Sequence, residues 1–117
     1  MKRFKLLKDG WVKDNFLGID WFPEDKKMTW NQAKTEGINL PTTKQLESLI
    51  DRTKFNPAII EEAKILNLKT DDWYWAEEPY LNPVWSDYAW MVYFDVGIVD
   101  GCNKGGTSYV RAVRPSK

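Results

Sequence analysis

Histidine is absent from this sequence, cysteine occurs once, at Cys102, and no apolar run reaches the length of a membrane-spanning helix. Without histidine the chain lacks the usual general base near neutral pH, which excludes Ser-His and Cys-His triads. One cysteine can form neither an internal disulfide nor a cysteine zinc cluster. We therefore expect no enzymatic activity, no cofactor and no metal site.

The opening segment MKRFKLLKDGW is basic but has no apolar stretch of the kind found in signal peptides. With no membrane-spanning run either, we predict a cytoplasmic protein without a membrane partner. The chain has 117 residues, of which 43% are apolar and 15% aromatic, enough for one globular domain with a core. The prediction is a single domain over residues 1–117.

Charge is unevenly distributed, although the 17 basic and 17 acidic side chains cancel. Residues 71–100 contain seven acids and no Lys or Arg, whereas the first thirteen residues contain five basic groups and one acid. The aromatic part of the chain lies in the acidic window, so it lacks the basic groove that accompanies stacking on single-stranded nucleic acid. We expect a neutral or basic partner there and no nucleic acid.

Three helices are predicted in the first half of the chain. Thr29 would cap a helix over residues 30–36, and Thr42 or Thr43 would cap a second one. Asn56 followed by a proline predicts the start of a third helix in NPAIIEEAKILN. The residues predicted to be buried by the second and third helices are Leu46, Leu49, Ile50, Ile59 or Ile60, Ala63 and Leu66.

Strand patterns dominate after Asp72, and one earlier strand-turn-strand pattern is WVKDNFLGIDWF. In AWMVYFDVGIV, the alternation puts Trp90, Val92 and Phe94 on one face, and the break at residues 95–97 predicts a hairpin turn. Helices in the first half and strands in the second predict an α+β fold. In that fold two to three helices pack on a twisted antiparallel sheet.

Two arginines, Arg111 and Arg114, lie in SYVRAVR on opposite faces of one predicted strand. Either they pair with acids and stack on aromatic rings, which we favour, or one of them binds an anionic ligand.

Six short motifs occur in order along nearly the whole chain. They are DNFLGIDW at 14–21, MTW at 28–30 with Ala33, NLPT at 39–42 with QL at 45–46, YW at 74–75, AW at 89–90 with Val92 and FDVG at 94–97, and VR at both 110–111 and 113–114. Together they resemble the C-terminal domain of Legionella collagen-like protein, a family that is widespread in bacteria and their phages.

That resemblance implies a C-type-lectin-like α+β fold, related to formylglycine-generating enzymes and to the variable proteins of diversity-generating retroelements. The chain departs from the family pattern at three points. Ile38-Asn39 stands where Trp-Arg is usual, Ala76-Glu77-Glu78 replaces Ser-Ser-Thr, and the frequent cysteine pair is missing. Two carboxylates thus occupy a loop that is normally small and neutral.

The aromatic residues divide into two groups. Those on motif positions are predicted to form the core, and they are Trp30, Trp75, Trp90 and Phe94. Those in the Pro-rich stretch from 78 to 88 either fold over the sheet or form a contact surface, and they are Tyr80, Trp85 and Tyr88.

Three kinds of chemistry were weighed against simple binding. A calcium-dependent lectin site could draw on Glu77, Glu78, Asn82 and Asp87, but the sugar-binding motifs of such lectins are incomplete here. A formylglycine-type oxygenase needs two cysteines. A paired-carboxylate hydrolase is weakly supported, because adjacent acids on a strand point to opposite faces.

We therefore predict a non-enzymatic binding module whose 77–88 loop contacts a protein partner with a neutral or basic surface. The expected contacts are Tyr80, Trp85 and Tyr88, ringed by Glu77, Glu78 and Asp87. One version of this hypothesis is a phage accessory or inhibitor protein whose acidic face occupies a basic host surface. The alternative is a domain that binds glycans or sulfated polysaccharides, which would require Arg111, Arg114 or the basic N-terminus.

Overall fold

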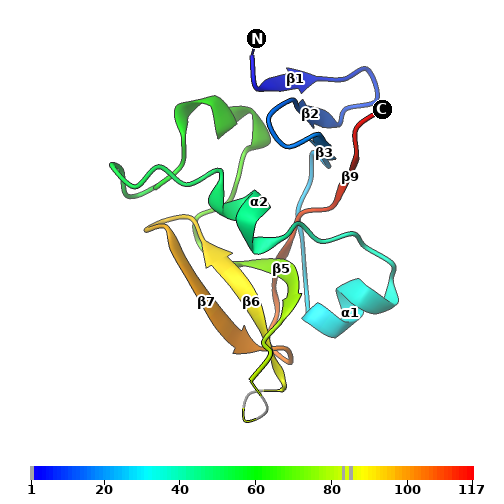
Figure 1. The fold of residues 1–117 in the computed structure, drawn as a ribbon, viewed down its shortest axis with the longest axis vertical. Helices are drawn as coiled ribbons and strands as arrows, with labels where there is room; N and C mark the ends of the chain where they lie inside the picture. Colours follow the sequence, from blue (N-terminus) through cyan, green and yellow to red (C-terminus); the bar gives the residue numbers. More distant parts are fainter. Residues whose placement is uncertain (1, 83, 85) are drawn as a thin grey trace.

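Two β-sheets lie toward opposite ends of the molecule's long direction, with both chain termini at one end (Figure 1). The computed structural model describes residues 2–82, 84 and 86–117. Among these residues, one sheet has four strands, all in antiparallel pairs. Its order is β1 (Phe4–Leu6), β2 (Val12–Asp14), β3 (Ile19–Trp21) and β9 (Val113–Pro115).

The other described sheet has five strands and is mixed, because β5 and β8 pair in parallel. Its order is β4 (Lys26–Met28), β8 (Ser108–Val110), β5 (Tyr74–Pro79), β6 (Tyr88–Tyr93) and β7 (Ile98–Asn103). The predicted hairpin at residues 95–97 is confirmed as the β6–β7 turn, where Gly97 has a φ of 74°. The architecture is α+β, but the first half contributes four strands as well as helices.

Two α-helices begin at the predicted threonines. In α1 (Trp30–Thr35) and α2 (Thr43–Glu47), the side chains of Thr29 and Thr42 each accept the backbone N–H of a glutamine three residues on. That glutamine in turn accepts the N–H of the threonine, so both are capping boxes. Within the described residues, no helix is long and apolar enough to cross a membrane.

The predicted third helix is wrong in its start. Asn56 has a φ of 51°, and its N–H donates to the carbonyl of Asp95, while the N–H of Ala58 donates to Phe94. These bonds hold residues 56–58 against the β6–β7 turn in a non-helical bend. The helical stretch begins only at η1 (Glu61–Leu66), a 3-10 helix. It does bury the predicted Ala63 and Leu66.

The segment SYVRAVR forms two strands rather than the predicted one. β8 belongs to the five-stranded sheet and β9 to the four-stranded sheet, so Arg111 lies between the two sheets. At this crossing the N–H of Val113 donates to Asn39 and the carbonyl of Ala112 accepts from Phe22. These bonds hold residues 112 and 113 in place where the chain passes from one sheet to the other.

The core consists of two clusters of buried side chains. One joins both sheets to α2 and η1, and it contains Trp21, Leu46, Tyr74 and Phe94. The other surrounds Trp75 beneath α1. Of the four aromatic residues predicted to lie in the core, Trp75 and Phe94 are fully buried, whereas Trp30 and Trp90 are partly buried.

The first motif is organised around the buried carboxylate of Asp14. Its oxygens accept bonds from Nε and Nη2 of Arg3 at 3.0 Å each and from the indole N–H of Trp21 at 3.1 Å. The backbone N–H groups of Phe16 and Leu17 also donate to it. A buried carboxylate is tolerated only with such partners. The motif thus explains how β2, the turn and β3 are held together.

Candidate functional site

The loop between β5 and β6 leaves the sheet after an irregular stretch of β5. Trp75 pairs with Met91, but four residues later Pro79 pairs with Ala89, which is only two residues back along β6. The extra residues of β5 are hydrogen-bonded to groups outside the sheet. The indole N–H of Trp30 donates to the carbonyl of Ala76 at 3.0 Å. This bulge directs the following residues away from the sheet.

Tyr80 forms the base of the loop. Its N–H donates to the carbonyl of Tyr88 at 2.9 Å, which closes the hairpin. Its ring lies 4.5 Å from that of Trp90, centroid to centroid, at an interplanar angle of 32°. A Cβ on Gly101, the β7 partner of Trp90, would come 2.2 Å from the Tyr80 ring. Gly101 therefore provides the space in which Tyr80 packs on the sheet.

The returning arm of the loop is held by Lys104, in the turn after β7. Its N–H donates to the carbonyl of Asp87 at 2.7 Å, and its ammonium donates to the carbonyl of Ser86 at 3.2 Å. The same ammonium lies 4.6 Å from the centroid of the Trp30 ring. Both arms of the loop are thus attached to the body of the domain.

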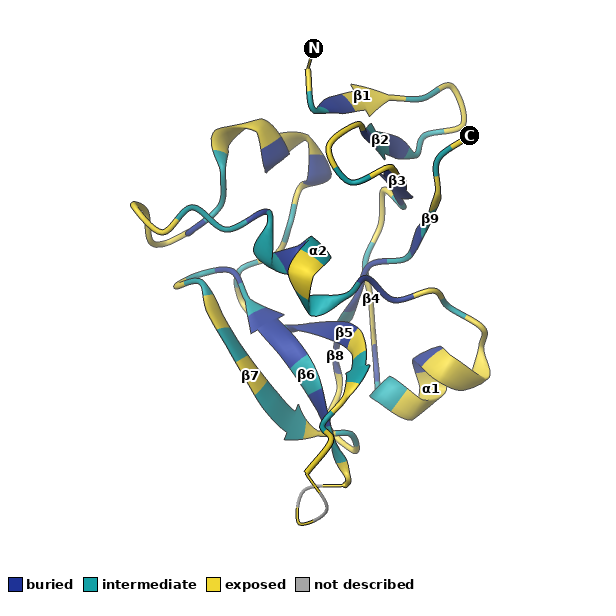
Figure 2. Cartoon of the chain, viewed as in Figure 1, coloured by how far each residue is buried: buried dark blue, intermediate teal, exposed yellow. Residues whose placement is uncertain are grey.

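Between these attachments the loop exposes apolar side chains, as its yellow colour in Figure 2 shows. Leu81 is 89% exposed and Val84 is 79% exposed. Beside them is an open groove of about 620 Å³. Its lining residues are Glu78, Pro79, Tyr80, Leu81, Asn82 and Trp90. An exposed apolar tip beside an aromatic groove is typical of a contact surface.

The three predicted acids lie in different surroundings. Glu77 and Asp87 are exposed. Glu78 is half-buried, and its two carboxylate oxygens accept the N–H and the hydroxyl of Thr43, each at 2.9 Å. Glu78 therefore links β5 to the first residue of α2. Asp87 is exposed on the loop itself, whereas Glu77 lies on β5 and lines a separate groove with Lys34 and Arg114.

The two remaining aromatic predictions have different outcomes. Tyr88 is the first residue of β6 and is half-buried, and its ring lies 6.3 Å from that of Tyr80 in an edge-on arrangement. Tyr80 and Tyr88 thus fold over the sheet, as one of the two predicted alternatives has it, while Leu81 and Val84 between them are exposed. Trp85 lies outside the described residues.

Arg111 is 1% exposed, which corrects its prediction as a ligand-binding residue. Its Nε donates to Oδ1 of Asp25 at 2.6 Å, and the hydroxyl of Tyr74 donates to the other oxygen at 2.8 Å. Burial, and then the charge of Asp25, raises the pKa of Tyr74. Within the described residues, Nη1 of Arg111 is buried without a hydrogen-bond partner. The guanidinium is inside the protein and out of reach of a surface ligand.

Arg114 makes both contacts that we favoured for the arginines. Its Nε donates to Asp20 at 2.8 Å, its Nη2 donates to Asp9 at 2.7 Å, and its guanidinium carbon lies 4.1 Å from the centroid of the Trp11 ring. The bond from Arg114 lowers the pKa of Asp9. Arg114 also lines a groove of about 340 Å³, together with Leu7, Lys8, Asp9, Lys13, Asp20 and Lys117.

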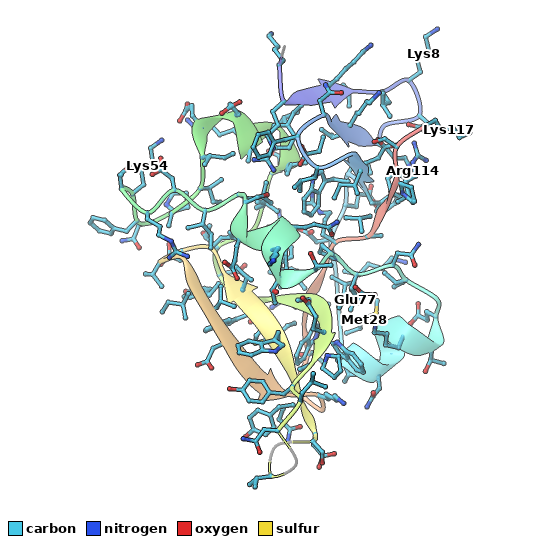
Figure 3. The ribbon with its side chains drawn as sticks, in the orientation of Figure 1. Lys8, Met28, Lys54, Glu77, Arg114 and Lys117 are labelled. Carbon is cyan, nitrogen blue, oxygen red and sulfur yellow. The ribbon has the colours of Figure 1, made fainter. Side chains whose placement is uncertain are left out.

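This basic groove and the aromatic loop are separate sites. Figure 3 shows Lys8, Arg114 and Lys117 together near the chain termini, at the opposite end of the molecule from the loop. The structure therefore does not bring the predicted arginines and the predicted loop residues into one site. Among the described residues, no group of three or more His, Cys, Asp or Glu side chains is placed to hold a metal ion.

Sequence reasoning missed three residues that shape the loop site. Leu81 could have been identified from the sequence, because it is an apolar residue in a loop that contains Pro and Asn. Gly101 could have been identified too, because a glycine inside a strand pattern often marks a close approach of other groups. No sequence pattern indicated Lys104, because its contacts with Ser86 and Asp87 depend on where the next turn lies in the fold.

The family comparison agrees with the motif pattern. The model of the Lcl C-terminal domain matches residues 10–114, so the chain belongs to this family. Neither curated proteins nor solved structures include a match to the chain.

Proposed function

We propose that this chain is a non-enzymatic binding module that contacts a protein partner through the β5–β6 loop. The observation that carries this proposal is the pair of exposed apolar side chains, Leu81 and Val84, beside the groove formed by Tyr80 and Trp90. Apolar side chains at such exposure lose contact with water when a partner covers them, which favours association.

The surroundings of the tip indicate what kind of partner fits. Exposed Asn82 and Asp87 place polar groups near the apolar tip, and a polar rim around an apolar centre is the usual layout of a protein interface. The partner should therefore have an apolar pocket with neutral or basic residues around it. The attachments of Tyr80 and Lys104 limit the entropy that the loop loses on binding.

The same proposal takes the α+β architecture as a C-type-lectin-like fold, as the family resemblance implies. It is supported by the position of the loop, which extends from a hairpin of the larger sheet with two attached arms. Loops on such a scaffold can carry binding residues without affecting the core.

Binding of a sulfated polysaccharide is the alternative function, and the basic groove around Arg114 favours it. Three lysines line this groove, Lys8, Lys13 and Lys117. A sulfated polymer would be bound there and not at the acidic loop. Retention on a sulfated dextran matrix that is lost in Lys8→Glu but kept in Leu81→Ser would favour this alternative over a protein partner.

The main proposal is tested by site-specific photo-cross-linking. A photoreactive phenylalanine replaces Leu81 in one variant and Phe55 in a matched control, and each is irradiated in a cell lysate. Phe55 is 74% exposed but belongs to the segment next to Lys54, away from the loop in Figure 3. We expect one protein to be joined to position 81 and not to position 55.

The partner found in this way is then purified for titration. Leu81→Ser and Val84→Ser should each weaken binding about tenfold, or about 1.4 kcal/mol, whereas Phe55→Ser should have no effect. Equal cross-linking at both positions, or unchanged affinity of the loop variants, would refute the proposed surface.

A further inference from the structure

We infer that copies of this chain associate head to tail, with the β5–β6 loop of one copy bound to the β1 end of the next. The inference rests on the proposed role of the loop and names a second copy of the chain as one of its partners. It starts from two surfaces of the same protein that have complementary charge and exposed apolar side chains.

The loop end is apolar and acidic. Leu81 and Val84 are exposed at its tip, Asp87 is exposed on the returning arm, and Asp100 is exposed farther along the sheet, on β7 opposite Met91. Within the described residues, the Asp87 carboxylate has no bonded partner, and that of Asp100 accepts only the N–H of the next residue. In the part of the chain that the structure describes, neither carboxylate forms an ion pair, and the nearby ammonium of Lys104 donates to the carbonyl of Ser86.

The opposite end is apolar and basic. Leu6 on β1 is 62% exposed. Lys5, next to it, and Lys8, in the following turn, are also exposed, and within the described part of the chain their ammonium groups form no ion pair. Behind them is the basic groove of about 340 Å³, which Lys13 and Lys117 also line. This end therefore has the surface that the loop end should bind.

Contact between the two ends is favoured by the charge of the whole molecule. The net charge is zero, so copies do not repel one another at long range. The loop and β1 lie at opposite ends of a molecule that measures 44 Å along its longest axis (Figure 1). A contact between different surfaces at opposite ends repeats from copy to copy and produces chains, not closed two-fold dimers.

Pairing through the exposed edge of β7 is the competing mode of self-association, and the structure disfavours it. The N–H of Gly101 already donates to the carboxylate of Asp100 at 2.7 Å, and the side-chain oxygen of Asn103 accepts the N–H of Gly105 at 2.8 Å. A charged side chain at the edge also hinders the approach of another strand.

The test uses two charge-reversed variants that keep the buried residues intact. The first changes the loop by Leu81→Lys and Asp87→Lys, and the second changes the β1 end by Lys5→Glu and Lys8→Glu. All four side chains are exposed, so both variants should fold, which thermal unfolding verifies. Sedimentation equilibrium measures the average mass at protein concentrations up to about 1 mM, where even weak contacts are populated.

For the wild type at about 20 mM NaCl, we expect the average mass to rise continuously with concentration. At about 300 mM NaCl the association constant should fall roughly tenfold, because salt screens the charges. Each variant alone should remain monomeric. An equal mixture should associate again, since the second variant keeps the acidic loop and the first keeps the basic end.

A monomeric wild type at low salt would overturn the inference, as would a mixture that stays monomeric while the wild type associates. The proposed function has its own readout. A different protein cross-linked to position 81, together with a monomeric wild type, would support the binding module and overturn only self-association. If no protein is cross-linked to position 81 and the wild type is monomeric, both fail.

Discussion

The start of β5 and the loop that follows it have similar aromatic and apolar residues but opposite environments. Tyr74, Trp75 and Ala76 are each 0% exposed, whereas Leu81 is 89% exposed. The first three residues lie in the middle of the sheet, next to β6 on one side and β8 on the other. Leu81 lies beyond the last pair of the ladder, so nothing covers it. Position in the sheet, not residue type, decides which aromatic segment is core.

The two arginines show the same contrast between a buried and a more exposed position. Arg111 lies at the crossing between the sheets and is buried with Asp25, whereas Arg114 is on the short strand β9 and its side chain is 34% exposed. Both bind a buried carboxylate, but the guanidinium of Arg111 is itself buried, whereas that of Arg114 reaches solvent, and Asp20 also accepts the hydroxyl of Ser116. Similar contacts therefore predict different energetic consequences.

The largest effect is expected from a change to the buried residues at the start of β5. Trp75→Ala removes a fully buried ring whose indole N–H donates to the carbonyl of Met28 at 3.1 Å. We expect a loss of about 3–5 kcal/mol in the free energy of unfolding, as for other buried aromatic residues. Urea denaturation measures this loss, and a value below about 1 kcal/mol would place Trp75 outside the core.

A second prediction separates the two arginines. Arg111→Met should cost about 3–5 kcal/mol, because the carboxylate of Asp25 would remain buried without its cation. Arg114→Met should cost clearly less, since its guanidinium and Asp9 are partly exposed and the buried carboxylate of Asp20 keeps the hydroxyl of Ser116. Chemical denaturation of both variants gives the difference. Equal losses would contradict the contrast drawn from burial.

A third prediction concerns the boundary between core and loop. Gly101→Ala should displace the Tyr80 ring and cost about 1 kcal/mol through loss of its stacking on Trp90. In a Tyr80→Ala background, the same change should be neutral or slightly stabilising, because the clash is gone. A double-mutant cycle measured by thermal unfolding gives this coupling. Additive effects would show that Tyr80 does not pack on Gly101.

The smallest effect on stability is expected at the tip of the loop. Leu81→Ser should change the free energy of unfolding by no more than about 0.5 kcal/mol, because the side chain is almost wholly exposed. The thermal midpoint of the variant reports this directly. A clear loss of stability would assign Leu81 to the fold and weaken its proposed role in binding.

Local signals explain the parts of the fold that were predicted correctly. The caps at Thr29 and Thr42 involve residues only three positions apart, and the β6–β7 turn depends on Gly97. The start of the third helix was wrong because the bent backbone of residues 56–58 is hydrogen-bonded to a turn almost forty residues away. No local pattern contains that partner.

The candidate site was predictable to the same extent. The acidic and aromatic composition of the loop predicted a candidate contact surface there, and Tyr80 and Glu78 were named from it. Their actual contacts, with Trp90 and Thr43, depend on the bulge in β5 and on the position of α2. The sequence pattern could therefore locate the loop but could not separate its structural residues from its exposed ones.

By itself, the sequence determined the motif order that defines the family, the helix caps, the hairpins and the uneven distribution of charge. These are properties of residues close together in the chain or of composition. Only the tertiary structure decided that Arg111 is buried, that Glu78 binds α2, and that the Tyr80 ring covers Gly101. Each of these depends on contacts between distant segments, because burial and hydrogen-bond partners are set by packing and not by neighbours in sequence.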